Sequence, residues 1–302
     1  MAKPEKADLQ SQRGGRRIPY VLIIPAMAFL FVFFIVPIIT LFKTSLSTKP
    51  NRLVAEYDFT WEWDNYSQAF DRFGGHLLRS FVFAGVATLL CVLIAYPVAY
   101  FIAFKGGRWR NVLLGLVMVP FFTSFLLRTI AWKSLLADQG PVLDLIRWLQ
   151  LDGVLESVGL MQDGRILNTS IAVIGGLTYN FLPFMLLPIY VSLEKIDARL
   201  IDAAADLYSP FGSTFRKVIL PLSLPGVFAG TLLTFIPATG DFINAEFLGD
   251  VESKRVIGQA VQSQFVDLND YPSAAGMSFV LMAIITALVL VYTKFMGTED
   301  LA

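Results

Sequence analysis

The chain has 302 residues, of which 55% are hydrophobic and only 16% charged, and its mean hydropathy is +0.62. Soluble domains are about 45–50% apolar, so the excess predicts a protein that lies in lipid. Lys and Arg balance Asp and Glu at 24 each, which argues against a nucleic-acid partner, and the single His76 and single Cys91 leave no material for a metal site or an internal disulfide.

Six apolar stretches follow a polar tail at 1–17; they cover about 18–42, 77–104, 112–136, 169–193, 222–248 and 273–296. At about 1.5 Å per residue, each is long enough to cross a hydrocarbon core of about 30 Å. The first is longer than the apolar part of a signal peptide and lacks its small-residue cleavage site, so we interpret it as an uncleaved helix. The sequence therefore predicts an all-α integral membrane protein with six transmembrane helices.

Lys and Arg in the connections predict the orientation of these helices. The tail and the loops 105–111 and 194–221 together carry 12 of these residues, against 9 in the segments 43–79, 137–168 and 249–272. The tail and loop 105–111 are also the densest, so we expect both termini in the cytoplasm. The chain then divides into a tail (1–17), a first helix (18–42), an external segment (43–76), a core domain (77–297) with the cytoplasmic loop 194–221, and a second tail (298–302).

The external segments are expected to be ordered. Several aromatic residues lie in 43–76, and the apolar pattern of Val142, Leu145, Ile146 and Leu149 predicts a short interfacial helix. Trp132 suits the depth of the lipid headgroups.

Loop 194–221 has the pattern of a short helix built for contact. Asp197 is a favourable N-cap, and alanine-rich sequence free of helix breakers predicts a helix over 198–207, ended by Ser209 and Pro210. Leu200, Ala203, Ala204 and Leu207 share one face, and Asp202 and Asp206 share another. Small side chains let another backbone approach closely, and a carboxylate can bind an arginine of a partner.

The same loop resembles the EAA loop of ATP-binding-cassette (ABC) importer permeases. That pattern is Glu-Ala-Ala, three residues, Gly, nine residues, then Ile-x-Leu-Pro, and its spacing is kept here from Asp202 to Pro221. Asp202 replaces Glu, Val218 replaces Ile and Tyr208 replaces Gly. Because a bulky residue is unfavourable at positive φ, we expect the exit turn to differ from the usual one, with Gly212 as the residue that absorbs it. The alternative is a plain amphipathic loop helix.

Over residues 77–297 the chain is most similar to the B-type permeases of spermidine/putrescine importers. The segments 127–132, 138–140, 235–242 and 246–249 carry this similarity. It implies a type I importer permease in the bacterial inner membrane that works with an ATPase dimer, a second permease of a different, C-type chain and an external substrate-binding protein. The coupling residues it implies are Asp202, Ala203, Ala204, Asp206, Leu207, Tyr208, Gly212, Leu220 and Pro221.

No phosphate-binding Gly-x-x-x-x-Gly-Lys-Ser/Thr loop occurs, so the chain is not expected to be an enzyme or to bind a cofactor, and ATP and Mg²⁺ are assigned to the partner. An ion-coupled secondary carrier would need no such loop and should show inverted repeats, which we do not find. Another cargo, such as a sugar, an amino acid or ferric iron, remains the main alternative.

The fifth apolar stretch is interrupted at Pro237 and Gly240, and Asp241, Asn244 and Glu246 follow. Because non-helical backbone at membrane depth lies inside protein or beside a water-filled cavity, these three residues are candidates for a cation path. Alternatively, Asp241 and Glu246 pair with Arg128 or Lys133. Further path candidates are Trp132 and the polar pair Tyr179 and Asn180, which could instead connect close-packed helices.

Overall fold

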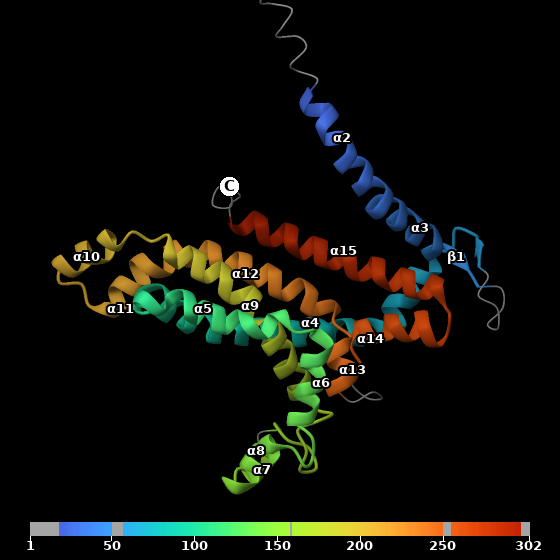
Figure 1. Ribbon diagram of the computed structural model, residues 1–302. Helices are drawn as coiled ribbons and strands as arrows, with labels where there is room; N and C mark the ends of the chain where they lie inside the picture. Colours follow the sequence, from blue (N-terminus) through green and yellow to red (C-terminus); the bar gives the residue numbers. More distant parts are fainter. Residues whose placement is uncertain (1–17, 50–56, 158, 250–254, 297–302) are drawn as a thin grey trace, which may run out of the picture.

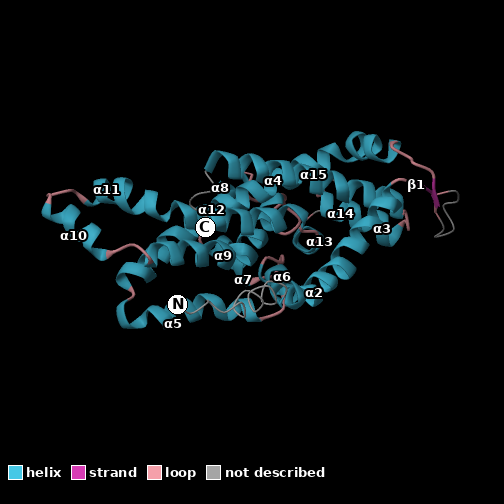
Figure 2. Ribbon diagram, turned by 90° about the horizontal axis from the view of Figure 1, so that it is seen from above, coloured by secondary structure: helices cyan, strands magenta, loops and turns pink. Residues whose placement is uncertain are grey.

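The structure is a computed structural model, and it describes residues 18–49, 57–157, 159–249 and 255–296. The two tails, 1–17 and 298–302, lie outside the described residues. Five helices are long and apolar enough to cross a membrane, and a bent pair makes a sixth possible span, as the six apolar stretches predict. The only strands in the described part of the chain form a short hairpin outside the helices (Figure 2).

Four long helices form the body (Figure 1): α4 (Asp64–Tyr100), α9 (Ser170–Glu194), α12 (Leu220–Gly240) and α15 (Tyr271–Met296). The π-helical turn η2 (Phe101–Lys105) extends α4. Together with α11 (Phe211–Thr214) and the π-helical turn η5 (Phe215–Ile219), α12 makes one continuous helix of 30 residues. The helix α4 therefore begins thirteen residues before the expected start at 77, and the fifth span begins eleven residues before the expected start at 222.

Small residues bring the backbones of α9 and α12 close together. A Cβ atom at Gly226 would lie 2.4 Å from the carbonyl oxygen of Pro188, and one at Gly230 would lie 2.7 Å from the sulfur of Met185. On α4, Ala84, Ala87, Ala95 and Ala99 are fully buried. Such packing drives helix association in lipid, where apolar burial by itself contributes little.

The first span leaves the body. It consists of α2 (Ile18–Leu30), the π-helical turn η1 (Phe31–Ile35) and α3 (Val36–Ser45), and only α3 makes extensive contact with α15 (Figure 1). None of its most apolar window is buried within the chain. Strands β1 (Ser47–Thr48) and β2 (Asp58–Phe59) follow and pair antiparallel, with Ser47 opposite Phe59.

The third apolar stretch is not one uninterrupted helix, and the expectation for 112–136 is wrong in that respect. After η3 (Gly107–Trp109), α5 (Arg110–Met118) and η4 (Val119–Phe122), the chain turns by 92° into α6 (Phe125–Leu135). Thr123 and Ser124 at the turn are extended. Pro120 sits at the start of η4, where its missing donor weakens the helix, and the Thr123 hydroxyl donates to the Pro120 carbonyl at 2.6 Å.

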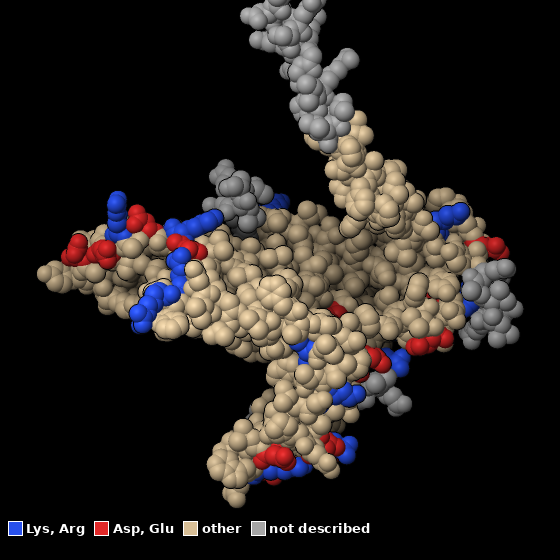
Figure 3. All heavy atoms as spheres, in the orientation of Figure 1, with Lys and Arg blue, Asp and Glu red and all other residues tan. Residues whose placement is uncertain are grey.

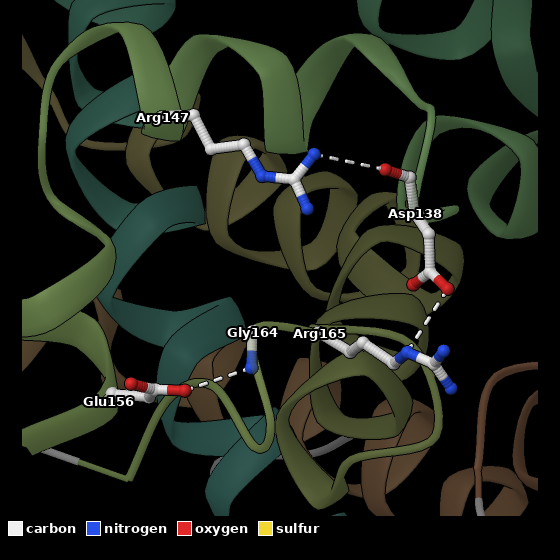
Figure 4. A network of polar contacts seen from close by, with 5 residues as sticks. All are labelled: Asp138, Arg147, Glu156, Gly164 and Arg165. Atoms are coloured by element: carbon white, nitrogen blue, oxygen red, sulfur yellow. Dashed lines mark hydrogen bonds and ion pairs between the residues drawn. The ribbon is translucent and has the colours of Figure 1, made fainter.

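Beyond the bend, α6 leads into an outer arm, residues 125–168, that projects from the body (Figure 1). It contains α7 (Pro141–Trp148), which confirms the predicted short helix, and α8 (Asp152–Ser157). Polar contacts link parts of the arm: the Asp138 carboxylate pairs with Arg165 at 3.1 Å and its carbonyl accepts from Arg147 at 3.4 Å, while Glu156 accepts from the backbone N–H of Gly164 (Figure 4).

The fifth span is continuous through Pro237 and ends at Gly240, later than the expected break. Asp241 and Phe242 separate it from α13 (Ile243–Leu248). The segment expected as a connection at 249–272 also contains α14 (Ile257–Gln262) and the π-helical turn η6 (Ser263–Asp267). A Cβ atom at Gly258 would lie 2.6 Å from the Gly240 carbonyl oxygen, so α14 packs directly on the end of α12.

Substituting Gly226 with alanine should destabilise the protein by about 1–3 kcal/mol, because the added methyl group overlaps the Pro188 carbonyl. The measurement is the thermal unfolding midpoint of the detergent-purified protein. Gly85→Ala in α4 is the control, since a Cβ atom there meets nothing within 4 Å. Equal midpoints for the two variants would contradict the packing argument.

Candidate functional site

The loop helix α10 (Ala198–Asp206) lies at one end of the body, beside α11 and opposite the end that carries β1 (Figures 1 and 2). The Asp197 carboxylate accepts from the backbone N–H of Arg199 at 2.9 Å, which confirms the predicted N-cap. Ile196 and Ile201 pack against the buried cluster of α4 and α9. The helix is therefore fastened to the body by one side only.

The other side of α10 is free. Asp202, Ala203 and Asp206 are exposed, Ala204 is half-buried, and Leu200 is 47% exposed. Neither carboxylate forms an ion pair with another described residue. The alanine ridge and the acidic edge that the sequence predicts are thus both available to a partner.

Tyr208 makes the turn that follows α10. Its φ is +54°, in the left-handed region, and the expectation that Gly212 would absorb the turn is wrong: Gly212 lies within α11. The N–H of Ser209 donates to Ala204 at 3.0 Å and that of Tyr208 to Ala205 at 2.9 Å. These two bonds define a Schellman ending, which satisfies free carbonyl groups of the helix and holds the unfavourable conformation.

Leu220 and Pro221 do not begin the fifth span, as the sequence suggested, but lie inside the continuous helix directly after η5. A π-helical turn shifts the hydrogen-bonding pattern, so a proline can follow it without breaking the helix. Leu220 is half-buried and Pro221 is exposed.

At the far end of α12, a buried network joins α6, α9 and α13. The Asn180 amide nitrogen donates to Asn244 at 2.9 Å and to Thr129 at 3.2 Å. The Asp241 carboxylate accepts from the backbone and side chain of Asn244 at 2.8 and 3.2 Å. Thr129, Asn180 and Asn244 are fully buried. The structure thus brings together three predicted path candidates, and the buried Asn180 has the geometry of a connection between helices.

Thr129 was missed by sequence reasoning, although it stands next to Arg128 in the segment that carries the family resemblance. From the sequence alone, its hydroxyl is expected to bond only a carbonyl group of its own helix. Only the packing of α6 on α9 places it against two asparagine side chains.

The remaining candidates lie around this network. Glu246 is exposed and accepts from Gln259 at 3.0 Å, and the rings of Trp132 and Tyr179 stack edge-to-face with centroids 5.5 Å apart. Arg128 is buried, 5.3 and 5.7 Å from the ring centroids of Phe121 and Phe125. The suggested pairing of Asp241 or Glu246 with Arg128 or Lys133 does not occur among the described residues.

A cavity of about 590 Å³ borders the break between α12 and α13. Gly240 and Phe242, the neighbours of Asp241, line it from one side, and α14, η6 and α15 line it from the other. Most of its wall is apolar, and Gln262, Ser278 and Thr286 are its polar side chains. The non-helical backbone at Phe242 therefore borders an open and mostly apolar groove.

Comparison with known proteins gives consistent matches. A family model for the binding-protein-dependent transport system inner membrane component matches residues 92–297. The spermidine/putrescine transport system permease protein PotB of Escherichia coli is 35% identical over 274 residues, which cover 90% of this chain and 96% of that protein. PotB of Haemophilus influenzae is 34% identical and covers 88% and 90%, and the E. coli inner membrane ABC transporter permease protein YdcU is 32% identical and covers 74% and 72%.

Two solved structures share the fold. A bacterial ABC transporter involved in the import of the acidic polysaccharide alginate has a TM-score of 0.68 at 14% identity, covering 95% of this chain and 98% of its own. The alginate transporter in complex with its pentasaccharide-bound periplasmic protein has a TM-score of 0.70 at 15% identity and covers 96% of both chains.

Asn180→Leu should destabilise the protein by about 1–3 kcal/mol, because it removes the amide that bonds Thr129 and Asn244 in a buried site. Thermal unfolding in detergent measures the effect. Thr178→Val is the matched control, since the Thr178 hydroxyl bonds only the Ile174 carbonyl of its own helix. The network would carry no stability if the two variants unfolded alike.

Proposed function

This chain belongs to the binding-protein-dependent transport system inner membrane components, as a permease subunit of an ABC importer, and we propose that its cargo is a polyamine of the spermidine or putrescine type. It is a multi-pass protein of the inner membrane and not an enzyme. Such a subunit works with a separate ATPase and a substrate-binding protein.

The identity of 35% with the spermidine/putrescine permease PotB, over nine tenths of this chain, carries the cargo proposal. The carboxylates of Asp241, just before α13, and of Glu246, within α13, support it, because polyamines are cations and acidic groups along their path lower the cost of leaving water. The alginate transporters share the fold at 14–15% identity, and at such low identity their cargo says nothing about the cargo of this chain. The alternative cargoes are a sugar, an amino acid or ferric iron, and transport measurements distinguish them from a polyamine.

The proposed path passes the break between α12 and α13. There Asp241 adjoins the cavity-lining residues Gly240 and Phe242, and Glu246 is exposed. Asn180 and Asn244, which are buried and bonded to each other, would shape the path by fixing α13. Trp132 and Tyr179 would act in the same way, through their stacked rings between α6 and α9.

The proposed orientation puts α10 and both termini in the cytoplasm. The Lys and Arg residues of loop 194–221 support it. On that side, Asp202, Ala203 and Ala204 would contact one subunit of an ATPase dimer that binds ATP and Mg²⁺, with Asp206, Leu207, Gly212, Leu220 and Pro221 shaping the loop. The second permease would be a different, C-type chain, and the substrate-binding protein would dock at the opposite end, near β1 and α14.

Asp241→Asn should reduce spermidine uptake roughly tenfold. The amide keeps an oxygen that can accept from Asn244, but removes a charge whose attraction for a cation is worth about 1–2 kcal/mol. Uptake is measured in proteoliposomes that hold the complete importer, and Glu246→Gln is expected to act in the same direction. Asp152→Asn on α8, in the outer arm, is the control. Normal uptake by both path variants would show that the carboxylates are structural.

Ala203→Arg should abolish uptake and co-purification of the ATPase, because the long side chain prevents close approach to the exposed ridge. Ala198→Arg, on a different face of the same helix, should leave both intact. Membrane insertion, followed by size-exclusion chromatography of the fluorescently tagged chain, should be normal in both. Unchanged uptake by Ala203→Arg would exclude docking through this face.

A further inference from the structure

Three large side chains just after the end of α10 are highly exposed. Leu207 is 81% exposed, Tyr208 95% and Phe211 66%, and no other large hydrophobic residue in the described chain is as exposed as Tyr208. Phe211 contacts the rings of Tyr100 and Phe215, but Tyr208 makes no ring contact or side-chain hydrogen bond with the described residues. No contact among the described residues accounts for an aromatic ring at this position.

The backbone makes this ring costly. Left-handed φ is unfavourable by about 1–2 kcal/mol for a residue with a Cβ atom, and glycine avoids that cost. The Schellman bonds from Tyr208 and Ser209 hold the turn through backbone atoms alone, so glycine would serve them equally well. The turn therefore costs stability that glycine would avoid, and a fully exposed tyrosine at this position indicates a role for its ring in contact with a partner.

The surroundings of Tyr208 identify the class of that partner. It lies at the end of the body where charged side chains gather (Figure 3), with exposed Asp206 two positions before it. Arg110 and Glu194 pair at 2.7 Å where α9 ends, before the chain reaches α10. Exposed Arg199, Arg216 and Lys217 lie on the same loop as the carboxylates, so this end of the protein presents charges of both signs, which suits a protein partner. Tyr208 follows directly on α10, whose exposed Ala203 the proposed function assigns to the contact with the ATPase.

We propose that Tyr208 is an anchor and specificity residue for the ATPase: its ring, with Leu207, enters an apolar pocket beside the groove that receives the alanine ridge. This inference rests on the proposed function. Tyrosine combines a large contact area with few rotatable bonds, and it is among the residues that most often dominate binding interfaces. An ATPase that lacks the pocket would clash with the ring and bind weakly. The tyrosine would therefore help to determine which ATPase pairs with this permease.

Tyr208→Gly distinguishes a structural role of this residue in the turn from a role in binding the ATPase. It removes the ring and relieves the strained backbone, so the thermal unfolding midpoint should stay equal or rise. Binding of the purified cognate ATPase to the complete permease pair in nanodiscs should weaken at least about tenfold, and spermidine uptake should fall. Tyr208→Phe keeps the ring and should bind within about threefold of the wild type.

Gln150→Gly is the matched control, because Gln150 also has a φ of +54° but lies in the outer arm; it should leave ATPase binding unchanged. If Tyr208→Gly binds the ATPase as tightly as the wild type while Ala203→Arg does not, the docking function stands and the anchor is rejected. If neither variant affects binding, the proposed docking itself falls.

A spin label tests lipid as the alternative partner. On Tyr208→Cys in a Cys91→Ala background, the label should be mobile in nanodiscs without ATPase and immobilised when ATPase is added. Immobilisation before ATPase is added would assign the site to the lipid surface and overturn the proposal.

Discussion

The close contact of α9 with α12 is the constraint on which the rest of the structure depends. In lipid, helices associate through short-range packing, and two glycines of α12 let its backbone reach the carbonyl of Pro188 and the side chain of Met185. The loop helix α10 connects the end of α9 to the start of α11. The α12 helix ends at the break at Asp241. Both functional regions are therefore positioned by one packed pair of helices.

The continuous helix from α11 to α12 links these two regions directly. Its 30 residues span about 45 Å, from the loop that would meet the ATPase to the cavity beside Asp241. The π-helical turn η5 lets the helix pass Pro221 without a break, and Pro237 lies within α12 as well. A single element therefore connects the turn 207–210, which follows α10, to the candidate path.

Polar side chains are bonded to one another at the break after α12 but are left exposed at α10. At the Asp241 break, Asn180, Asn244 and Thr129 bond one another, because unpaired polar groups within a membrane protein are costly. Arg128 nearby lies against the rings of Phe121 and Phe125, and Asp241 and Glu246 form no ion pair in the part of the chain that the structure describes. At α10, in contrast, Asp202 and Asp206 have no partner among the described residues and Tyr208 carries strain, as expected of a surface completed by another protein.

The sequence by itself determined the membrane location, the apolar spans, the N-cap at Asp197 and the exposed faces of α10. These follow from hydropathy, length and helical spacing, which are local properties. Only the tertiary structure decided the 92° turn at Thr123, since Pro120 also resembles the prolines that α9 and α12 tolerate. It alone joined Thr129, Asn180 and Asn244, which are 51 and 64 residues apart and meet only through packing. It also decided the turn at Tyr208, because two backbone hydrogen bonds outweigh the local preference of tyrosine, and local preference is all that a sequence pattern records.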